Sequence, residues 1–185
     1  METEFETQIL DIDKEEIIKK LQSLGAREDK EFFMRRWVYD INPTGCSEWL
    51  RLRTNGHKTT ICYKKRKNHS IDGTSEIEVV VDDFEKTHEL ISRLNFYCDM
   101  YYQENKRVNF YIDDIEFALQ DWPMIPTVLE IEAKSKEGVK KGLQLLGLEG
   151  KDNGHHGFIA IYKKYGIDLH KMKILKFNQH TIEQK

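Results

Sequence analysis

Alternation of apolar and polar residues is the dominant pattern along this chain. Eight segments alternate with a period of two and are rich in β-branched and aromatic residues, which is typical of β-strands. Helical patterns fall singly between groups of strands, whereas a parallel sheet needs a crossover helix after nearly every strand, so the pattern predicts an α+β fold with an antiparallel sheet. We expect the strands at residues 3–10, 31–41, 48–54, 58–66, 75–82, 99–112, 115–121 and 127–134.

Helices are expected in the segments where the apolar spacing lengthens to three or four residues. Asp13 is placed to cap the start of the first helix, and Gly25 stands where a helix ends. In the second helix we expect Leu90, Ile91 and Leu94 to face inward. The expected helices are residues 14–24, residues 84–94, the segment between Ser135 and Gly147, and a short one at about 157–165.

The polar faces of several strands carry charges of one sign. Arg51 and Arg53 share one face of their strand, and Glu130 and Glu132 share one face of theirs. A sheet with one dry and one wet face is the common explanation for a single strand of this kind. Like charges two residues apart repel each other, however, so solubility alone gives little reason to pair them. We therefore favour a sheet that closes on itself, with helices covering its apolar outside and the charges inside.

A closed barrel of eight strands has an interior wide enough for side chains or one small ligand. Guanidinium groups bind phosphate oxygens in pairs, lysine adds a point charge, and carboxylates hold hard divalent cations. Both kinds of side chain together are what a metal-bound polyphosphate requires. The residues predicted inside are the basic Arg51, Arg53, Lys64 and Arg107 and the acidic Glu4, Glu6, Glu76, Glu78, Glu130 and Glu132.

The order and spacing of these motifs resemble the CYTH family, the triphosphate tunnel metalloenzymes. No single motif is specific for the family. The order and spacing of all of them, between about residue 3 and residue 165, are specific. Arg107 and Asp121 stand where the family keeps a basic and an acidic residue. The matching stretches are Glu4-Phe5-Glu6-Thr7-Gln8 for an ExExK motif, Leu50-Arg51-Leu52-Arg53 for RxR, Tyr63-Lys64 for TYK, Glu76-Ile77-Glu78 for ExE and Leu129-Glu130-Ile131-Glu132 for EIE.

The resemblance implies a closed eight-stranded antiparallel β-barrel, with helices packed outside, that binds a triphosphate-bearing small molecule together with Mg or Mn. Members of the family include thiamine triphosphatases, inorganic tripolyphosphatases and class IV adenylyl cyclases. If the reaction is hydrolysis, the attacking water needs a carboxylate in the tunnel as its base, and Glu78 or Glu4 is the candidate. The implied substrate-binding residues are Arg51, Arg53, Lys64, Arg107 and Gln8, and the implied metal-binding residues are Glu4, Glu6, Glu76, Asp121, Glu130 and Glu132.

Two positions depart from the family pattern. Gln8 replaces the lysine of the first motif, and an amide cannot offer a phosphate a positive charge, which puts a mechanism that needs this lysine in question. Asp121 is in phase with Phe117 and Leu119, which we assign to the outer face of the barrel. An inward Asp121 therefore requires a β-bulge or a different register.

Three functions remain open at this point. We favour triphosphate hydrolysis, because it demands less of the protein than a reaction that also needs a base-binding pocket. A class IV adenylyl cyclase would instead use the ribose 3′-hydroxyl of ATP as nucleophile and release pyrophosphate. Gln8 favours a third function, a non-catalytic module that binds polyphosphate or nucleotide. The products distinguish them: orthophosphate, cyclic AMP with pyrophosphate, or neither.

The composition indicates the domain organisation and the kinds of partner to expect. With 39% hydrophobic and 11% aromatic residues, the 185-residue chain can fold as one domain, which we place at residues 1–170, followed by a polar tail at 171–185 whose last dozen residues are loosely held. The net charge of −3 argues against a nucleic-acid partner, and the longest apolar runs are too short for a membrane span. For some family members the resemblance implies a homodimer.

The cysteines and the first residues indicate a cytoplasmic protein. The three cysteines form no CxxC pair, and the acidic start of the chain is unlike a signal peptide. The neighbouring His155 and His156 lack the spacing of paired helix ligands, so we expect them to be solvent-exposed.

Overall fold

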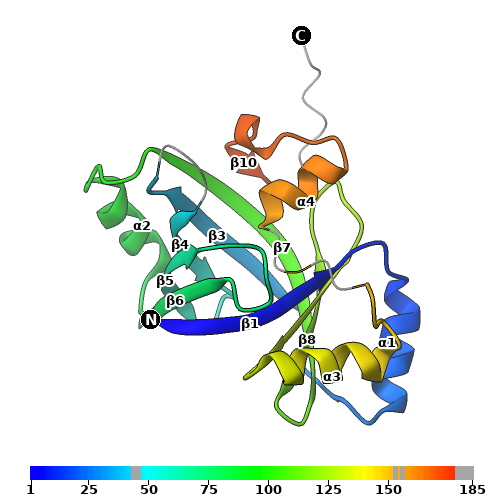
Figure 1. Cartoon of the computed structure of the whole chain (residues 1–185). Helices are drawn as coiled ribbons and strands as arrows, with labels where there is room; N and C mark the ends of the chain where they lie inside the picture. The colour runs from blue at the N-terminus through cyan, green and yellow to red at the C-terminus, as the bar shows by residue number, and fades with distance from the viewer. Residues whose placement is uncertain (43–46, 152–153, 155–156, 178–185) are drawn as a thin grey trace.

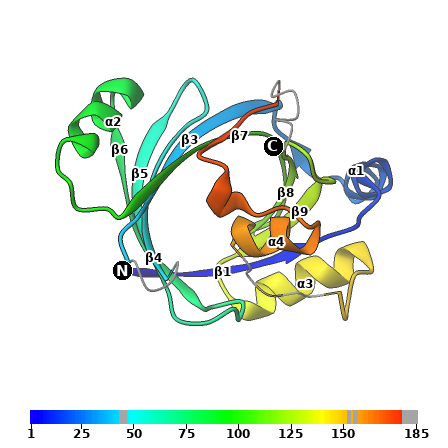
Figure 2. The ribbon, with the colours of Figure 1, turned by 90° about the horizontal axis from the view of Figure 1, so that it is seen from above.

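The computed structural model describes residues 1–42, 47–151, 154 and 157–177. Its strands are β1 (Glu2–Ile9), β2 (Arg27–Glu28), β3 (Phe32–Asp40), β4 (Glu48–Thr54), β5 (Thr59–Arg66), β6 (Thr74–Val81), β7 (Asp99–Ile112), β8 (Ile115–Asp121), β9 (Val128–Ala133) and β10 (Ile174–Leu175). They form one sheet in the order β10-β7-β3-β4-β5-β6-β1-β9-β8. Because β8 also pairs with β7, eight strands close into a ring (Figures 1 and 2).

The predicted fold, a closed eight-stranded antiparallel barrel with helices outside, is confirmed. Every pairing around the ring is antiparallel, and each predicted strand begins and ends within one residue of the observed one. Neither β2 nor β10 was predicted, because two residues are too few for a period of two to appear. Both of them pair with β7 outside the ring.

The helices are α1 (Lys14–Ser23), α2 (Phe84–Ser92), α3 (Lys136–Leu146) and α4 (Phe158–Lys164), with a 3₁₀ turn η1 (Leu169–Lys171). The predicted cap of α1 is present: the carboxylate of Asp13 accepts a hydrogen bond from the backbone N–H of Glu16 at 3.0 Å. Gly25 follows the helix at φ +74°, a conformation that glycine adopts without strain. Within the described residues, no helix is long and apolar enough to cross a membrane.

The main hydrophobic core lies outside the ring, between the barrel and two helices. The apolar face of α1 meets that of α3, and α3 packs on β1, β8 and β9 (Figure 1). Leu21 and Leu143 contribute from the helices, and Phe117, Leu129 and Ile131 contribute from the strands. These side chains are almost completely buried, so the outer face is the dry one here. The polar face of the same strands is thereby turned into the barrel.

A second hydrophobic core lies between α2 and the barrel, and part of the prediction from the sequence is wrong there. Phe84 and Ile91 pack on the barrel, but Leu90 and Leu94, which we expected to face inward, are 62% and 59% exposed. The helix ends at Ser92, so Leu94 does not continue its apolar stripe. The contacts of α2 with the barrel centre on β4.

The C-terminal segment covers one opening of the ring. Viewed from above, α4 and η1 lie across this opening (Figure 2). Leu175 of β10 is 1% exposed and packs with Trp122, Tyr162 and Leu169, so the expectation of a loosely held end is wrong for this strand. The boundary at residue 170 stays a prediction. His155, His156 and residues 178–185 lie outside the described residues.

The contact between α3 and the barrel gives a direct test of the fold. A Cβ atom added at Gly142 would lie 2.6 Å from Cγ2 of the buried Ile131. Gly142→Ala should therefore lower the free energy of unfolding by about 1–3 kcal/mol, although alanine is the better helix former. Chemical denaturation measures this change. Lys140→Ala on the exposed side of α3 is the control, and a Gly142→Ala protein as stable as wild type would contradict the close packing.

Candidate active site

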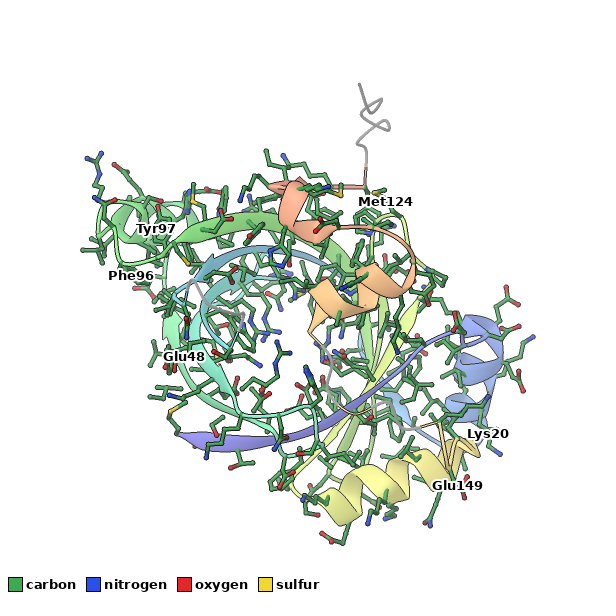
Figure 3. The ribbon with its side chains drawn as sticks, turned by 45° about the horizontal axis from the view of Figure 1, so that its top comes forward. Lys20, Glu48, Phe96, Tyr97, Met124 and Glu149 are labelled. Atoms are coloured by element: carbon green, nitrogen blue, oxygen red, sulfur yellow. The ribbon has the colours of Figure 1, made fainter. Side chains whose placement is uncertain are left out.

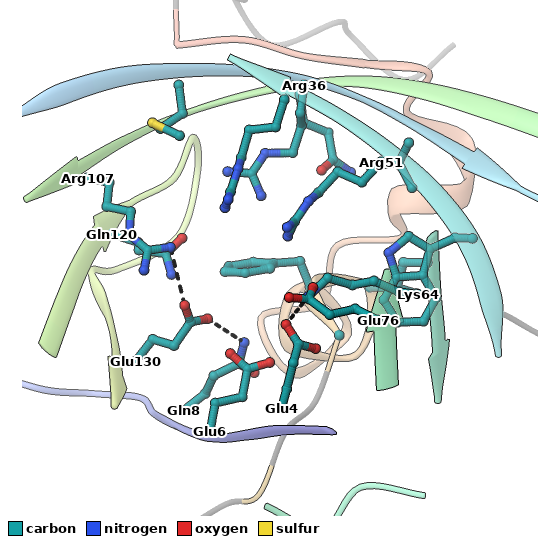
Figure 4. Close-up of a pocket in the computed structure, with 18 of the residues that line it drawn as sticks. Glu4, Glu6, Gln8, Arg36, Arg51, Lys64, Glu76, Arg107, Gln120 and Glu130 are labelled. Carbon is teal, nitrogen blue, oxygen red and sulfur yellow. Dashed lines mark hydrogen bonds and ion pairs between the residues drawn. The ribbon is translucent and has the colours of Figure 1, made fainter. Parts of the chain in front are cut away.

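The ring encloses a cavity of about 610 Å³ that is lined by the polar faces of all eight barrel strands and by α4 (Figures 3 and 4). The strands bring together eleven of the twelve site residues that the sequence predicted. These are Glu4, Glu6, Gln8, Arg51, Arg53, Lys64, Glu76, Glu78, Arg107, Glu130 and Glu132.

Strand register places carboxylates next to one another on one wall. Glu6 of β1 is the direct partner of Glu132 of β9, which in turn faces Glu116 of β8. Carboxylate oxygens of Glu6, Glu130 and Glu132 all lie within 4.8 Å of one another. Like charges directly opposite each other destabilise a sheet, so this wall favours the binding of a cation.

The pKa of Glu132 reflects this crowding. Burial is the largest cause, and Glu6 and Glu130 add to it, so that the pKa of Glu132 rises to about 8. A divalent cation would relieve both effects, since it replaces the lost hydration and neutralises the repulsion. Three carboxylates with converging oxygens are the donor set that Mg²⁺ or Mn²⁺ takes, so the residues present fit the metal that the family resemblance implies.

Arginines gather elsewhere in the cavity, with fewer acidic partners. Nη2 of Arg51 and Nη2 of Arg53 each lie 3.6 Å from the same oxygen of Glu78. The neighbouring Arg51 is the main reason that the pKa of Arg53 falls to about 10. One carboxylate thus neutralises only part of the charge of two guanidinium groups. The remaining positive charge makes this part of the cavity suited to an anionic ligand.

Arg107 links the arginines to the carboxylate wall. Its Nη2 atom lies 2.6 Å from Oε1 of Glu116 and its Nη1 atom 3.3 Å from Oε1 of Glu130. Burial lowers the pKa of Arg107, but these carboxylates outweigh burial and raise it overall. Gln8 reaches the same wall, because its Nε2 atom donates to Oε2 of Glu130 at 3.3 Å.

Lys64 lies between two carboxylates. It forms a salt bridge with Glu4, and its Nζ atom is 3.2 Å from Oε2 of Glu76, which also accepts a hydrogen bond from the thiol of Cys62. Burial raises the pKa of Glu4 to about 7 against the opposing effect of Lys64. For Glu76, burial is outweighed by Lys64 and Cys62, and the pKa falls to about 2. Oε2 of Glu4 is buried and finds no hydrogen-bond partner among the described residues.

Arg36 of β3 lines the cavity but was not predicted from the sequence to do so. Its side chain is 6% exposed, it donates a hydrogen bond to Asn105, and its guanidinium lies 4.5 Å from the ring centre of Trp122. Burial, followed by repulsion from nearby arginines, holds its pKa well below the ordinary value. The adjacent Arg35 and Arg36 place one charge on each face of β3, so alternation alone could not say which one lies inside.

Further lining residues were also missed. Glu116 and Gln120 could have been found, because they alternate with the apolar outer residues of β8 in the same way as the predicted residues do. Gln103 and Asn109 of β7 and Arg66 of β5 are likewise in phase with predicted residues of their strands. Lys163 lies on α4, where strand alternation gives no signal. The additional polar lining residues include Asp40, Asn55, Arg66, Gln103, Asn109, Glu116, Gln120 and Lys163.

Asp121 does not line the cavity, so the structure does not bring it together with the other predicted metal-binding residues. Its carboxylate lies 2.5 Å from Nζ of Lys14 and accepts a hydrogen bond from Thr127 at 2.6 Å. β8 keeps one register with β7 from Ile115 to Asp121, so no bulge turns Asp121 inward. The outer-face assignment from the strand alternation is therefore correct.

Comparison with known proteins finds solved structures that are similar to this chain, but no matching sequence family. No sequence-family model matches the chain, and no curated protein matches it. A protein of Pyrococcus horikoshii is 25% identical at a TM-score of 0.68, over 80% of this chain and 93% of that one. A candidate adenylate cyclase of Vibrio parahaemolyticus has the same TM-score at 12% identity, over 88% of this chain and 98% of that one.

A third similar structure comes from Hippeastrum. It is an adenylyl cyclase candidate described as having a dominant triphosphatase activity, and it is 15% identical at a TM-score of 0.56, over 96% of this chain and 100% of that one. These structures share the fold of this chain, and its closed barrel is the fold that the resemblance to the CYTH family implies.

The carboxylate wall predicts a metal-binding defect for one substitution. Glu132→Gln keeps the side chain's size but removes one of the three converging carboxylates, so we expect Mn²⁺ affinity to fall about 10-fold or more. Calorimetric titration with Mn²⁺ alone measures the change.

Two variants serve as controls for this titration. Glu137→Gln, on the exposed first turn of α3, should leave Mn²⁺ affinity unchanged. Asp121→Asn should also leave it unchanged, while lowering stability by about 1 kcal/mol through the loss of the Lys14 ion pair. Equal Mn²⁺ affinity of Glu132→Gln and wild type would show that the cation binds elsewhere.

Proposed function

We propose that this chain is a metal-dependent phosphohydrolase that acts on a triphosphate compound. The observation that carries the proposal is the division of charge within one enclosed cavity: carboxylates crowd together on β1, β8 and β9, and arginines gather on β3 and β4. Either group alone would be unfavourable in a buried space. A polyphosphate that carries a divalent cation satisfies both of them at once.

The arginines and Lys64 would position the phosphate chain. Forked guanidinium groups of Arg51 and Arg53 fit phosphate oxygens in pairs, and they would hold the chain while negative charge moves to the leaving oxygen. A divalent cation held by Glu6, Glu130 and Glu132 would neutralise phosphate oxygens and polarise a water molecule. Most of the rate enhancement in such a reaction comes from positioning and from electrostatic stabilisation.

Glu4 is the better of the two candidate bases. Its Oε2 atom has no hydrogen-bond partner within the described part of the chain, so it is free to accept a proton from an attacking water. Glu78 is the less suitable candidate because one of its oxygens lies beside both Arg51 and Arg53. We therefore assign Glu78 to holding these arginines in the absence of substrate.

The structural neighbours support the proposal at the level of substrate class. The triphosphatase activity described for the Hippeastrum protein favours hydrolysis, and the candidate adenylate cyclase of Vibrio parahaemolyticus keeps nucleotide cyclisation as the second possibility. Both reactions use the same phosphate and metal groups and differ in the nucleophile. A product analysis separates them.

The first experiment incubates the protein with ATP, thiamine triphosphate or inorganic tripolyphosphate, each with Mg²⁺ or Mn²⁺, and identifies the products by phosphorus NMR. We expect orthophosphate from at least one of these. The Arg51→Ala/Arg53→Ala protein should lose about 10³-fold or more in kcat/KM, because two phosphate-binding groups are removed. Cyclic AMP with pyrophosphate would instead identify a cyclase. Binding without any product would identify a non-catalytic module.

A second experiment separates the two candidate bases. Glu4→Gln should lower kcat about 10²- to 10⁴-fold, because glutamine cannot accept the proton. The binding of tripolyphosphate should change only a few-fold. Glu78→Gln should act mainly on KM, since the glutamine no longer balances the charge of the two arginines. A Glu4→Gln protein with wild-type kcat would exclude Glu4 as the base.

A further inference from the structure

Among the described residues Arg36 has no counter-ion, and in this it differs from Arg51, Arg53, Lys64 and Arg107. Within the described part of the chain, no carboxylate lies within ion-pair distance of its guanidinium, whereas Lys64 and Arg107 each contact two carboxylates. Its hydrogen-bond partner Asn105 is a neutral amide. Its Nε atom is buried and finds no partner in the same part of the chain.

The neighbours of Arg36 make this position more unfavourable. Its direct cross-strand partner on β4 is Arg53, and Arg51 and Arg107 also repel it, whereas the attraction of Glu130 is weaker. A buried cation without a counter-ion costs several kcal/mol. Trp122 packs under the guanidinium and holds it in place, so the side chain does not escape to solvent. Figure 4 shows Arg36 reaching into the cavity across from Gln8. The geometry therefore fits an anionic group that arrives with a ligand.

Gln8 lies on the opposite wall of the cavity (Figure 4). It is the direct partner of Glu130, to which it donates a hydrogen bond, and it is 2% exposed. A lysine at this position would place a positive charge beside Glu130. In this chain position 8 on β1 is a buried neutral amide, and Arg36 on β3 is a buried cation.

We infer that Arg36 binds a phosphate group of the ligand and supplies the positive charge that Gln8 does not. The inference rests on the proposed function, because it assumes that the cavity takes a phosphate chain. The phosphate nearest Arg36 is then held by a cation on β3, while Gln8 on β1 contributes no charge.

The test is a double-mutant cycle at these two positions, with inorganic tripolyphosphate as the probe. Binding is measured by calorimetry under two conditions. One contains Mg²⁺; the other contains EDTA, which removes divalent cations and so prevents turnover. Arg36→Gln should weaken binding about 10- to 100-fold, the range expected for the loss of a charged hydrogen-bond donor. Its ligand-free melting temperature should stay equal or rise, because an uncompensated buried charge is removed. A residue with a purely structural role would lower that temperature.

A lysine introduced at position 8, on the opposite wall of the cavity, tests whether Arg36 replaces the positive charge that Gln8 lacks. Gln8→Lys in the Arg36→Gln background should recover at least about 10-fold of the lost affinity, and it should have a smaller effect when Arg36 is present. Arg36→Met is a second variant that fills the buried volume without polar atoms, and it should lose affinity as Arg36→Gln does. Arg35→Gln, on the outer face of β3, is the matched control and should bind as wild type does.

The outcomes separate this inference from the proposed function. If wild type does not bind tripolyphosphate under either condition, the proposed function fails and the inference fails with it. If wild type binds and Arg51→Ala/Arg53→Ala does not, while Arg36→Gln and Arg36→Met keep wild-type affinity, only the role of Arg36 is refuted. If Gln8→Lys recovers no affinity, Arg36 binds phosphate but does not replace the charge missing at position 8.

Discussion

Pairing of β7 with β8 closes the sheet, and the chemistry of the interior depends on that closure. An open sheet with the same residues would leave its charged face in water, where guanidinium and carboxylate groups are hydrated and interact weakly. Closure removes much of that water and makes each charge dependent on its neighbours. The raised pKa of Glu4 and the lowered pKa of Arg36 both have burial as their largest cause.

The ligand-free protein therefore contains unfavourable interactions that a ligand would remove. Glu6, Glu132 and Glu116 lie in one row across three strands, and Arg36 faces Arg53. The outer cores around Phe117 and Phe84 offset this cost, because they bury apolar side chains on the other side of the same strands. The fold thus separates the two tasks: stability comes from outside the ring and binding capacity from inside it.

Most of the fold and of the candidate site could be predicted from the sequence because a strand has only two faces. Once Leu50 and Leu52 are assigned outward, Arg51 and Arg53 must point inward. This logic fails where both faces carry the same charge, as at Arg35 and Arg36. At Asp121 the alternation was the better guide, because it places this side chain on the outer face whereas the family pattern places it inside. Cross-strand partners such as Glu6 and Glu132 cannot be predicted in this way, because register depends on pairing between distant parts of the chain.

The length of β7 has a consequence for how this chain can change over time. This strand of 14 residues borders β3 on one side and β8 on the other, and it pairs with β2 and β10 beyond the ring. An insertion of one residue near its middle would turn every later side chain to the opposite face, which would place Phe110 inside and Asn109 in the outer core. Single substitutions alter one contact at a time, whereas such an insertion would exchange the two surfaces of the molecule. Along β7, spacing is thus under stronger constraint than residue identity.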